Sequence, residues 1–166
     1  MGTTADRRPA EVQIRPYALA DRDAVLALAP RLLVGIAPWL DEAGFLVAAE
    51  RWIASSIAEI GPQQGVFVAE GGQEKLLGFV SVAHQVHFSG QERAYVHELI
   101  VAAEVEGAGL GRALLAAAEA WATAQGLPAI ELDTGAPNGH ARRFYAHLGY
   151  AEESIKLVKQ LPAPVP

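Results

Sequence analysis

The sequence predicts an α/β (α+β) fold built as one domain over residues 1–166. A chain of 166 residues is long enough to bury roughly two thirds of its unfolded surface around one core. Its 51% hydrophobic and 19% charged residues are typical of globular domains. Strand-like and helix-like segments follow one another without an internal repeat or a linker. We therefore expect no second domain, and flexible tails only at 1–10 and 162–166.

The N-terminal third is predicted to contain one strand followed by two helices. Residues 11–17 alternate apolar and polar side chains, as a half-buried strand does. Apolar residues recur at helical spacing over 21–33, where Pro30 predicts a break. A clearer helix follows Asp41, which is the expected N-cap, and ends at Gly61.

The rest of the chain is predicted to combine strands with two further helices. Two strands joined by a Gly-Gly turn are typical of an antiparallel hairpin, and a third strand follows a polar turn. A helix with one apolar face then precedes a short strand, a short helix and a last alternating strand. The predicted strands are 65–72, 76–88, 94–101, 129–134 and 154–161, and the predicted helices are 110–126 and 139–150.

Charge and the missing cysteines exclude several classes of function. Thirteen Lys and Arg against nineteen Asp and Glu give a net charge of -6, which has the wrong sign for a protein that binds nucleic acid. Without cysteine there is no disulfide, thiolate nucleophile or thiolate metal site. The sequence shows no apolar run suited to an export signal or a membrane span. We expect a soluble, cytoplasmic protein with no nucleic-acid or membrane partner.

Three glycines at every second position stand directly before the Ala-rich helix. The first N–H groups of a helix lack intrahelical partners, and the helix dipole makes this end attractive to anions. Gly107, Gly109 and Gly111 remove the Cβ atoms that would keep phosphate oxygens away. Arg112 and Ala113 stand where the dinucleotide and P-loop motifs need Gly or Lys-Ser/Thr. The stretch predicts a phosphate site of another kind, with a merely flexible turn as the alternative.

Two segments resemble the motifs of one family. Residues 101–121, "VAAEVEGAGLGRALLAAAEAW", resemble the pyrophosphate loop and following helix of the GNAT N-acetyltransferase superfamily, whose loop is usually written Q/R-x-x-G-x-G/A. Gly109 and Gly111 match this pattern, whereas Glu106 departs from its Gln or Arg. Residues 138–150 are similar to the family's N-x-x-A-x-x-F-Y-x-x-L-G-F/Y segment at every marked position. Two motifs in the right order make the resemblance specific.

The resemblance implies an acyl-CoA-dependent N-acetyltransferase. Its fold would be GNAT-like, with a mixed, mostly antiparallel sheet splayed into a V and flanked by about four helices. Acetyl-CoA would be the acyl donor, with its pantetheine arm on the main chain of the strand before the loop and its diphosphate on the loop backbone. The implied cofactor-binding residues are Leu99, Ile100, Val101, Glu106, Gly107, Ala108, Gly109, Leu110, Gly111, Arg112, Asn138 and Tyr145.

The implied reaction is the attack of a neutral primary amine on a thioester, whose leaving thiolate gains a proton. The resemblance makes Tyr145 the expected general acid, and a phenol with a pKa of about 10 keeps its proton at pH 7. Packing alone is the alternative role for this ring. Glu98 is the expected base, acting through water. His97 is its neighbour on the opposite strand face, so both face the cleft only if a bulge intervenes.

Glu106 is the position at which cofactor binding needs explanation. A carboxylate beside a diphosphate is repelled by about 1 kcal/mol where water screens the pair, and by more where it does not. We expect either that this side chain points away or that CoA binds more weakly. Arg142 and Arg143 are the candidate compensating cations, with a solvated helix face as the alternative.

Histidines and carboxylates on the other strands do not make a metal site on sequence grounds. His84 and His87 alternate on one strand, so only one is expected to see the site. At least one of Glu131 and Asp133 is expected to be structural or exposed to solvent. Because convergence of these groups is not established, we predict no metal.

The acceptor is expected to be a small-molecule amine or a peptide. It would lie near residues 34–44 and the hairpin around 84–91, and the surplus of carboxylates favours a cationic amine. Two other functions remain open: a non-catalytic acyl-CoA-binding sensor, and a structural protein that keeps only the fold. The expected assembly is a monomer or a homodimer.

Overall fold

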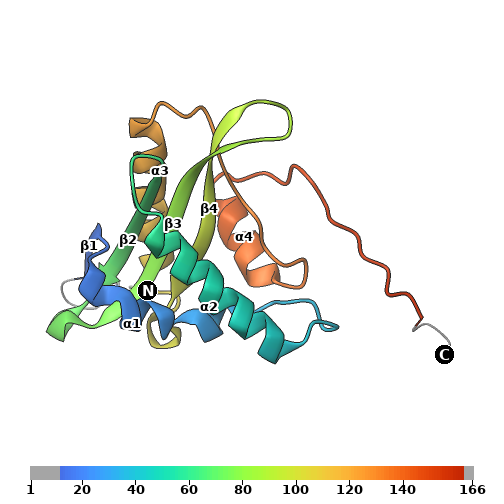
Figure 1. Cartoon of the computed structure of the whole chain (residues 1–166), viewed down its shortest axis with the longest axis horizontal. Coiled ribbons are helices and arrows are strands. Elements are labelled where there is room, and N and C mark those ends of the chain that lie inside the picture. Colours follow the sequence, from blue (N-terminus) through green and yellow to red (C-terminus); the bar gives the residue numbers. More distant parts are fainter. Residues whose placement is uncertain (1–11, 163–166) are drawn as a thin grey trace, which may run out of the picture.

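A computed structural model describes residues 12–162, and one five-stranded sheet organises it (Figure 1). The tails expected at 1–10 and 162–166 lie outside the described residues except for Pro162. The strands follow the sheet in chain order, β1-β2-β3-β4-β5. All neighbouring pairs are antiparallel except β4 and β5, which are parallel. The strands are β1 Gln13–Pro16, β2 Gln64–Glu70, β3 Leu76–Val86, β4 Glu92–Val101 and β5 Ile130–Leu132.

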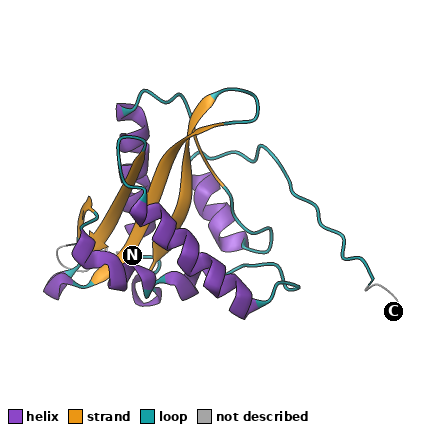
Figure 2. Ribbon diagram, viewed as in Figure 1, coloured by secondary structure: helices purple, strands orange, loops and turns teal. Residues whose placement is uncertain are grey.

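Four α-helices flank the sheet in the described part of the chain, as the resemblance implied (Figure 2). Asp41 caps the second helix as predicted, because its carboxylate accepts a hydrogen bond from Gly44 N at 2.6 Å. Pro30 lies in a separate 3-10 turn, so the break predicted there is confirmed. The helices are α1 Arg22–Leu26, α2 Glu42–Ala58, α3 Leu110–Ala124 and α4 Gly139–His147, and the 3-10 turns are η1 Leu19–Asp21, η2 Ala29–Leu33, η3 Gly72–Glu74 and η4 Ala103–Val105. None of the helices within residues 12–162 is both long and apolar enough to cross a bilayer.

Each face of the sheet carries its own apolar core. On β2, Val68 packs with the core under α1 and α2, whereas its neighbour Ala69 packs with the core under α3. Leu114 and Leu115 of α3 are fully buried, and each stabilises the fold by about 2 kcal/mol relative to an exposed side chain. Because successive residues of a strand point to opposite faces, the apolar runs in the middle strands are explained by two covered faces.

A bulge in β4 changes which residues share a face. Ser81 pairs with Glu98 while the next residue, Val82, pairs with Val96, so His97 is the extra residue on β4. Val96 packs in the core under α3, but Glu98 contacts Ser56 of α2 on the other face. The bulge therefore places His97 and Glu98 on the same face of the sheet, which was the condition for both to face the cleft.

The same strand provides an open edge. β4 pairs with β5 only over Ala94–Val96, so its edge beyond that point has no strand partner among residues 12–162. On the opposite side the pairing with β3 continues to Val101. The sheet thus opens between β4 and β5, in agreement with the splayed arrangement implied by the resemblance.

The strand predicted at 154–161 is wrong. Residues 151–162 form no secondary structure and run as an exposed extended segment away from the body of the molecule (Figure 1). Ile155, Leu157 and Leu161 are 76%, 89% and 77% exposed. Alternation shows that a segment suits a strand, but a strand also needs a partner edge. The short β5, of three residues, pairs with β4 alone in this part of the structure.

Candidate active site

The glycine loop before α3 has the conformation and the open space that a bound anion needs. Gly107 and Gly109 have φ values of 80° and 83°, a left-handed conformation that residues with a Cβ avoid. A Cβ built on either residue would meet no atom within 4 Å. These glycines are therefore required by backbone angle, and the space above them is free.

The loop also leaves amides without partners. Gly109 is the N-cap of α3 and no side chain caps this helix. Ala113 N donates to Gly109 O at 3.1 Å, which is the first turn of the helix. The N–H groups of Leu110, Gly111 and Arg112 precede that bond and lack intrahelical acceptors. Together with the helix dipole, they make this end of α3 attractive to an anion.

The third glycine has different surroundings. Gly111 has no positive φ, and a Cβ on it would lie 3.4 Å from Phe144 Cζ, which is ordinary van der Waals contact. A side chain at Gly111 would thus face α4, whereas Gly107 and Gly109 have open space above them. The expectation that all three glycines clear space for phosphate stays a prediction.

The open edge of β4 leads directly to this loop. Ala102 N donates to Leu77 O of β3 at 2.8 Å, so the alternate residues Val101 and Leu99 direct their main-chain groups to the edge that β5 leaves open. Ile100, also predicted to bind the cofactor, is 2% exposed and packs in the core under α1 and α2. Main-chain hydrogen-bonding groups of the β4 edge are therefore followed along the chain by the unpaired amides of the α3 N-terminus.

Glu106, the residue that departs from the family motif, is neutralised by a residue that the sequence did not suggest. Arg31 Nη2 donates to Glu106 Oε2 at 2.6 Å, and His140 Nε2 lies 3.7 Å from Glu106 Oε1. Arg142, one of the expected compensating cations, instead donates from Nε to Glu152 at 3.0 Å. No local motif predicts the Arg31 contact, because 75 residues separate the two partners.

Glu98, the expected base, is enclosed. It is 4% exposed and its carboxylate accepts hydrogen bonds from Ser81 and from Ser56, the latter at 2.9 Å. Gln64 in turn donates to the main-chain oxygen of Ser56 at 2.5 Å. His97, on the same face, is exposed, and its ring lies 5.0 Å from that of Tyr95. Glu98 is thus shielded from solvent, whereas His97 is open to it.

Tyr145, the expected acid, lies in α4 among aromatic rings. Its ring centre is 5.2 Å from Phe144 and 5.8 Å from Tyr150. Burial raises the pKa of Tyr145 to about 12, because the charged phenolate is poorly solvated there. The phenol therefore holds its proton throughout the physiological range.

Asn138 joins the start of α4 to the segment that precedes α2. Its Oδ1 caps α4 by accepting from Ala141 N at 3.1 Å, and its Nδ2 donates to Val34 O at 3.3 Å. A Cβ on Gly35 would clash with Asn138 Cβ, so the two segments approach each other more closely than a residue with a side chain would allow. The start of the predicted acceptor segment, 34–44, is thereby held against the N-terminal end of α4.

The remaining predicted polar residues lie at the other end of β4, where Glu131 and Asp133 have hydrogen-bond partners and the buried Nε2 of His84 has none among residues 12–162. Glu131 accepts from Arg93 Nη1 at 2.7 Å, and Asp133 accepts from the Tyr95 hydroxyl at 2.9 Å. His84 pairs in register with Ala94, far along β4 from the glycine loop.

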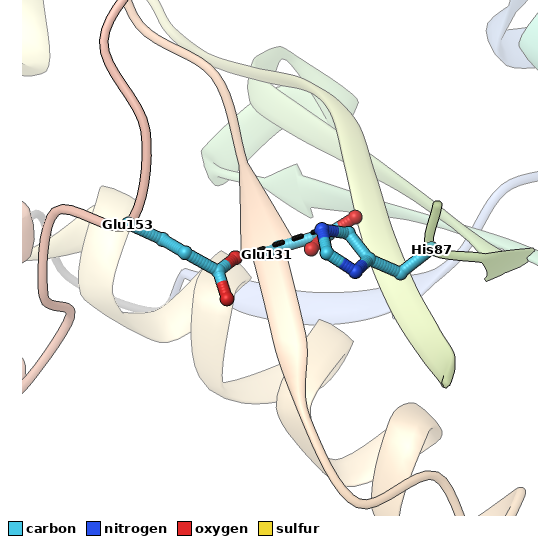
Figure 3. Close-up of side chains that lie close together, drawn as sticks. All are labelled: His87, Glu131 and Glu153. Atoms are coloured by element: carbon cyan, nitrogen blue, oxygen red, sulfur yellow. Dashed lines mark ion pairs between the residues drawn. The ribbon is translucent and has the colours of Figure 1, made fainter. Parts of the chain in front are cut away.

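His87, Glu131 and Glu153 converge closely enough to suggest a metal centre (Figure 3). Arg93, however, donates from Nη1 to Glu131 at 2.7 Å and to Glu153 at 2.6 Å. A metal ion would have to displace this guanidinium, so the cluster is an ion-pair network and we propose no metal there.

The family model of the acetyltransferase (GNAT) family matches residues 26–150. The chain belongs to the GNAT acetyltransferase family. A relative in sequence is an uncharacterized N-acetyltransferase of Methanocaldococcus jannaschii, 33% identical over 95 residues. That match covers 56% of this chain but only 42% of the relative's length.

Solved structures share the fold at low identity. A proposed acetyl transferase of Pyrococcus furiosus has a TM-score of 0.75 at 22% identity, covering 91% of this chain and 100% of that one. Glucosamine-6-phosphate N-acetyltransferase of Arabidopsis thaliana has a TM-score of 0.64 at 18% identity, covering 92% and 99%. The aminoglycoside N-acetyltransferase AAC(6')-Iy in complex with CoA has a TM-score of 0.68 at 16% identity, covering 95% and 99%.

Proposed function

We propose that this GNAT protein moves an acetyl group from acetyl-CoA to a primary amine by direct attack. The observation that carries the proposal is the continuity of two sets of main-chain groups: the open edge at Leu99 and the N–H of Val101, whose oxygen is held by Arg31, lead to the unpaired amides of the α3 N-terminus. Pantetheine contains amides that pair with such an edge, and a diphosphate needs such a helix end. The free space above Gly107 and Gly109 fits this ligand.

The donor would be held chiefly by main-chain groups. Leu99 and Val101 would bind the pantetheine arm, with Asn138 at the opposite wall. The backbone from Glu106 through Gly107, Ala108, Gly109, Leu110 and Gly111 to Arg112 would hold the diphosphate. When bound, acetyl-CoA supplies the activated acyl group, and the protein's share is to bind and orient it and to manage the protons.

Tyr145 is our proposed general acid. Its buried phenol remains protonated at neutral pH, and within residues 12–162 its hydroxyl makes no hydrogen bond that would compete for that proton. The thiolate that leaves from the cofactor would take this proton as its bond to the acyl carbon breaks.

Glu98 is our proposed base, reached through water rather than by direct contact. His97 stands beside it on the exposed side and is the second group through which the amine proton would pass. The relay is supported by the bulge, which brings the two side chains to one face. Glu98→Gln is expected to lower kcat while the KM for acetyl-CoA stays unchanged; an unchanged kcat with alkyl amines would remove Glu98 from the mechanism.

A cationic small-molecule amine is the acceptor that the site favours. Tyr95 has a raised pKa through burial, its hydrogen bond to Asp133 and the nearby carboxylates of Glu131 and Glu98. Glu131 is paired with Arg93, so Asp133 and Glu98 are the carboxylates of this set that would attract an ammonium group. The names of two structural neighbours, an aminoglycoside and a glucosamine-6-phosphate N-acetyltransferase, also favour a small amine over a peptide.

An acyl-CoA sensor without turnover is the second candidate, because the proposed base Glu98 is 4% exposed and is bound by two serines. The test is thiol release from acetyl-CoA with a panel of amino sugars, polyamines, amino acids and peptides, read beside calorimetric binding of acetyl-CoA. We expect release with at least one cationic amine. Tight binding without release from any amine would favour the sensor.

A further inference from the structure

Arg31 makes two contacts at the junction between β4 and the glycine loop. Its Nε donates to Val101 O at 3.1 Å and its Nη2 donates to Glu106 Oε2 at 2.6 Å. The side chain is 28% exposed, against 47% for Glu106. A guanidinium is suited to this role because its planar fork binds two acceptors in fixed directions, which an ammonium group does not.

We propose that Arg31 is a positioning residue that makes the loop competent to bind a diphosphate despite Glu106. It rests on the proposed function, because the anion in question is the diphosphate of acyl-CoA. The GNAT loop motif usually has Gln or Arg where this chain has Glu106. Here the missing favourable charge comes from η2, 75 residues earlier, and is fixed at its place by the carbonyl of Val101.

Neutralisation of Glu106 matters because an unpaired carboxylate at this position would repel the diphosphate. Two unit charges 4 Å apart interact by about 1 kcal/mol in water and by about 4 kcal/mol near a protein surface, and a diphosphate carries more than one charge. An unpaired Glu106 would therefore cancel much of what the loop amides contribute. Paired with Arg31, and with His140 at 3.7 Å from its other oxygen, the carboxylate has a cation within direct contact and its field is largely offset.

The pairing also holds the carboxylate in place. Arg31 is attached to the end of β4 through Val101 O, so the ion pair draws Glu106 toward η2. Lys75, which pairs with Glu104 at 2.6 Å in the same region, provides a matched comparison. That ion pair also joins a cation to a carboxylate just after β4. Glu104, however, precedes the glycine loop and is not part of the loop motif.

The experiment is calorimetric titration with CoA of the wild type and of Arg31→Gln, Glu106→Gln, the double variant and Lys75→Gln. We expect Arg31→Gln to weaken binding about tenfold, which is about 1.4 kcal/mol. Glu106→Gln and Lys75→Gln should stay within about threefold of the wild type, and the double variant should recover to about the same range. Recovery is the decisive result, because it cannot come from a purely structural role of Arg31.

Several results would overturn the proposal. An unchanged affinity in Arg31→Gln would do so, as would a double variant that binds as weakly as Arg31→Gln. A Glu106→Gln variant that binds CoA more than about tenfold tighter would show that the charge was not neutralised. If Arg31→Gln fails to fold, Arg31→Ala replaces it in the titration and in the double variant, with the same loss and the same recovery expected. A wild type that does not bind CoA would contradict the proposed function itself, before any variant is compared.

Discussion

Two glycines of the loop carry a conformation that no other residue adopts without strain. Gly109 has φ 83° with empty space where a Cβ would stand, so the cost of a substitution lies in the backbone and not in a clash. Since this residue is also the N-cap of α3, a change in its backbone angles turns the neighbouring amides. Conformation and ligand binding are therefore linked at this position.

Gly109→Ala is expected to lower the free energy of unfolding by about 1 kcal/mol and to weaken CoA binding. Gly72→Ala is the matched control, because Gly72 has neither a positive φ nor an atom within 4 Å of a built Cβ. Urea unfolding and calorimetry measure the two effects. Equal stability and equal affinity in both variants would show that the left-handed backbone is not needed.

Tyr145→Phe separates the acid from the packing role. The substitution keeps the ring, which lies against Phe144 and Tyr150, and removes only the proton donor. We expect kcat to fall about 10²-fold, within the usual range for general acid catalysis, with the affinity for acetyl-CoA unchanged. An unchanged kcat would leave Tyr145 as an aromatic packing residue.

An ion-pair network ties the N-terminal strand to the segment that follows it. Arg15 of β1 donates to Asp21 of η1 at 2.7 Å and to Glu70 of β2 at 2.7 Å. Hydrogen bonds from Arg15 hold the pKa of Asp21 below its usual range. The contribution to stability is then complete above the unfolded pKa of about 4 and is lost as the pH falls through the lower folded value.

Asp21→Asn is expected to cost about 1–2 kcal/mol at pH 6 and to make unfolding less sensitive to acid. Urea unfolding at pH 6 and pH 3 measures both. Asp23→Asn is the control, because Asp23 is 97% exposed in its side chain and lies 3.5 Å from Arg22. The same pH dependence in Asp21→Asn and the wild type would contradict the role given to this network.

The exposed segment after β5 and α4 contributes little to the folded state. Removing residues 155–166 is expected to change the free energy of unfolding by less than about 0.5 kcal/mol, while the Glu152 and Glu153 ion pairs remain. Urea unfolding of the truncated chain tests this. A larger loss, or a change of mass in light scattering, would show that Ile155 and Leu157 pack against another surface.

The elements that the sequence predicts correctly are those with a local signal. Periodicity, the Asp41 cap and the break at Pro30 depend on residues a few positions apart, and all appear as predicted. The prediction of a strand at 154–161 was wrong because a strand needs a partner edge, and that edge is distant in sequence. A bulge near His97 was named only as the condition under which His97 and Glu98 share a face. Its presence could not be predicted, because the pairing register is set by the facing strand.

The candidate site also combines features that have a local sequence signal with features that depend on distant residues. The loop and its unpaired amides are contiguous in sequence, so the sequence could indicate them, whereas the roles expected for Tyr145 and Glu98 stay predictions. The Arg31–Glu106 pair, the two serines that enclose Glu98 and the Asn138–Val34 contact join residues 17 to 104 positions apart. No pattern in a single sequence encodes such contacts.

Taken together, the two cores, the open β4 edge and the glycine loop form one arrangement. The α3 core fixes the loop at the end of β4, while the core under α1 and α2 holds η2, and with it Arg31, against that end. Binding of CoA should therefore stabilise the folded protein as a unit, since a ligand that binds only the native state raises its stability.

The most direct test is the melting temperature of the full chain with and without CoA, joined to calorimetric titration. At a CoA concentration of about 100 times the dissociation constant, the stabilisation is about 2.7 kcal/mol, and a rise of about 5–10 °C is expected for a chain of this size. Gly109→Ala should show a smaller rise. No shift in the wild type and no heat of binding would contradict the claim that the loop before α3 binds the diphosphate.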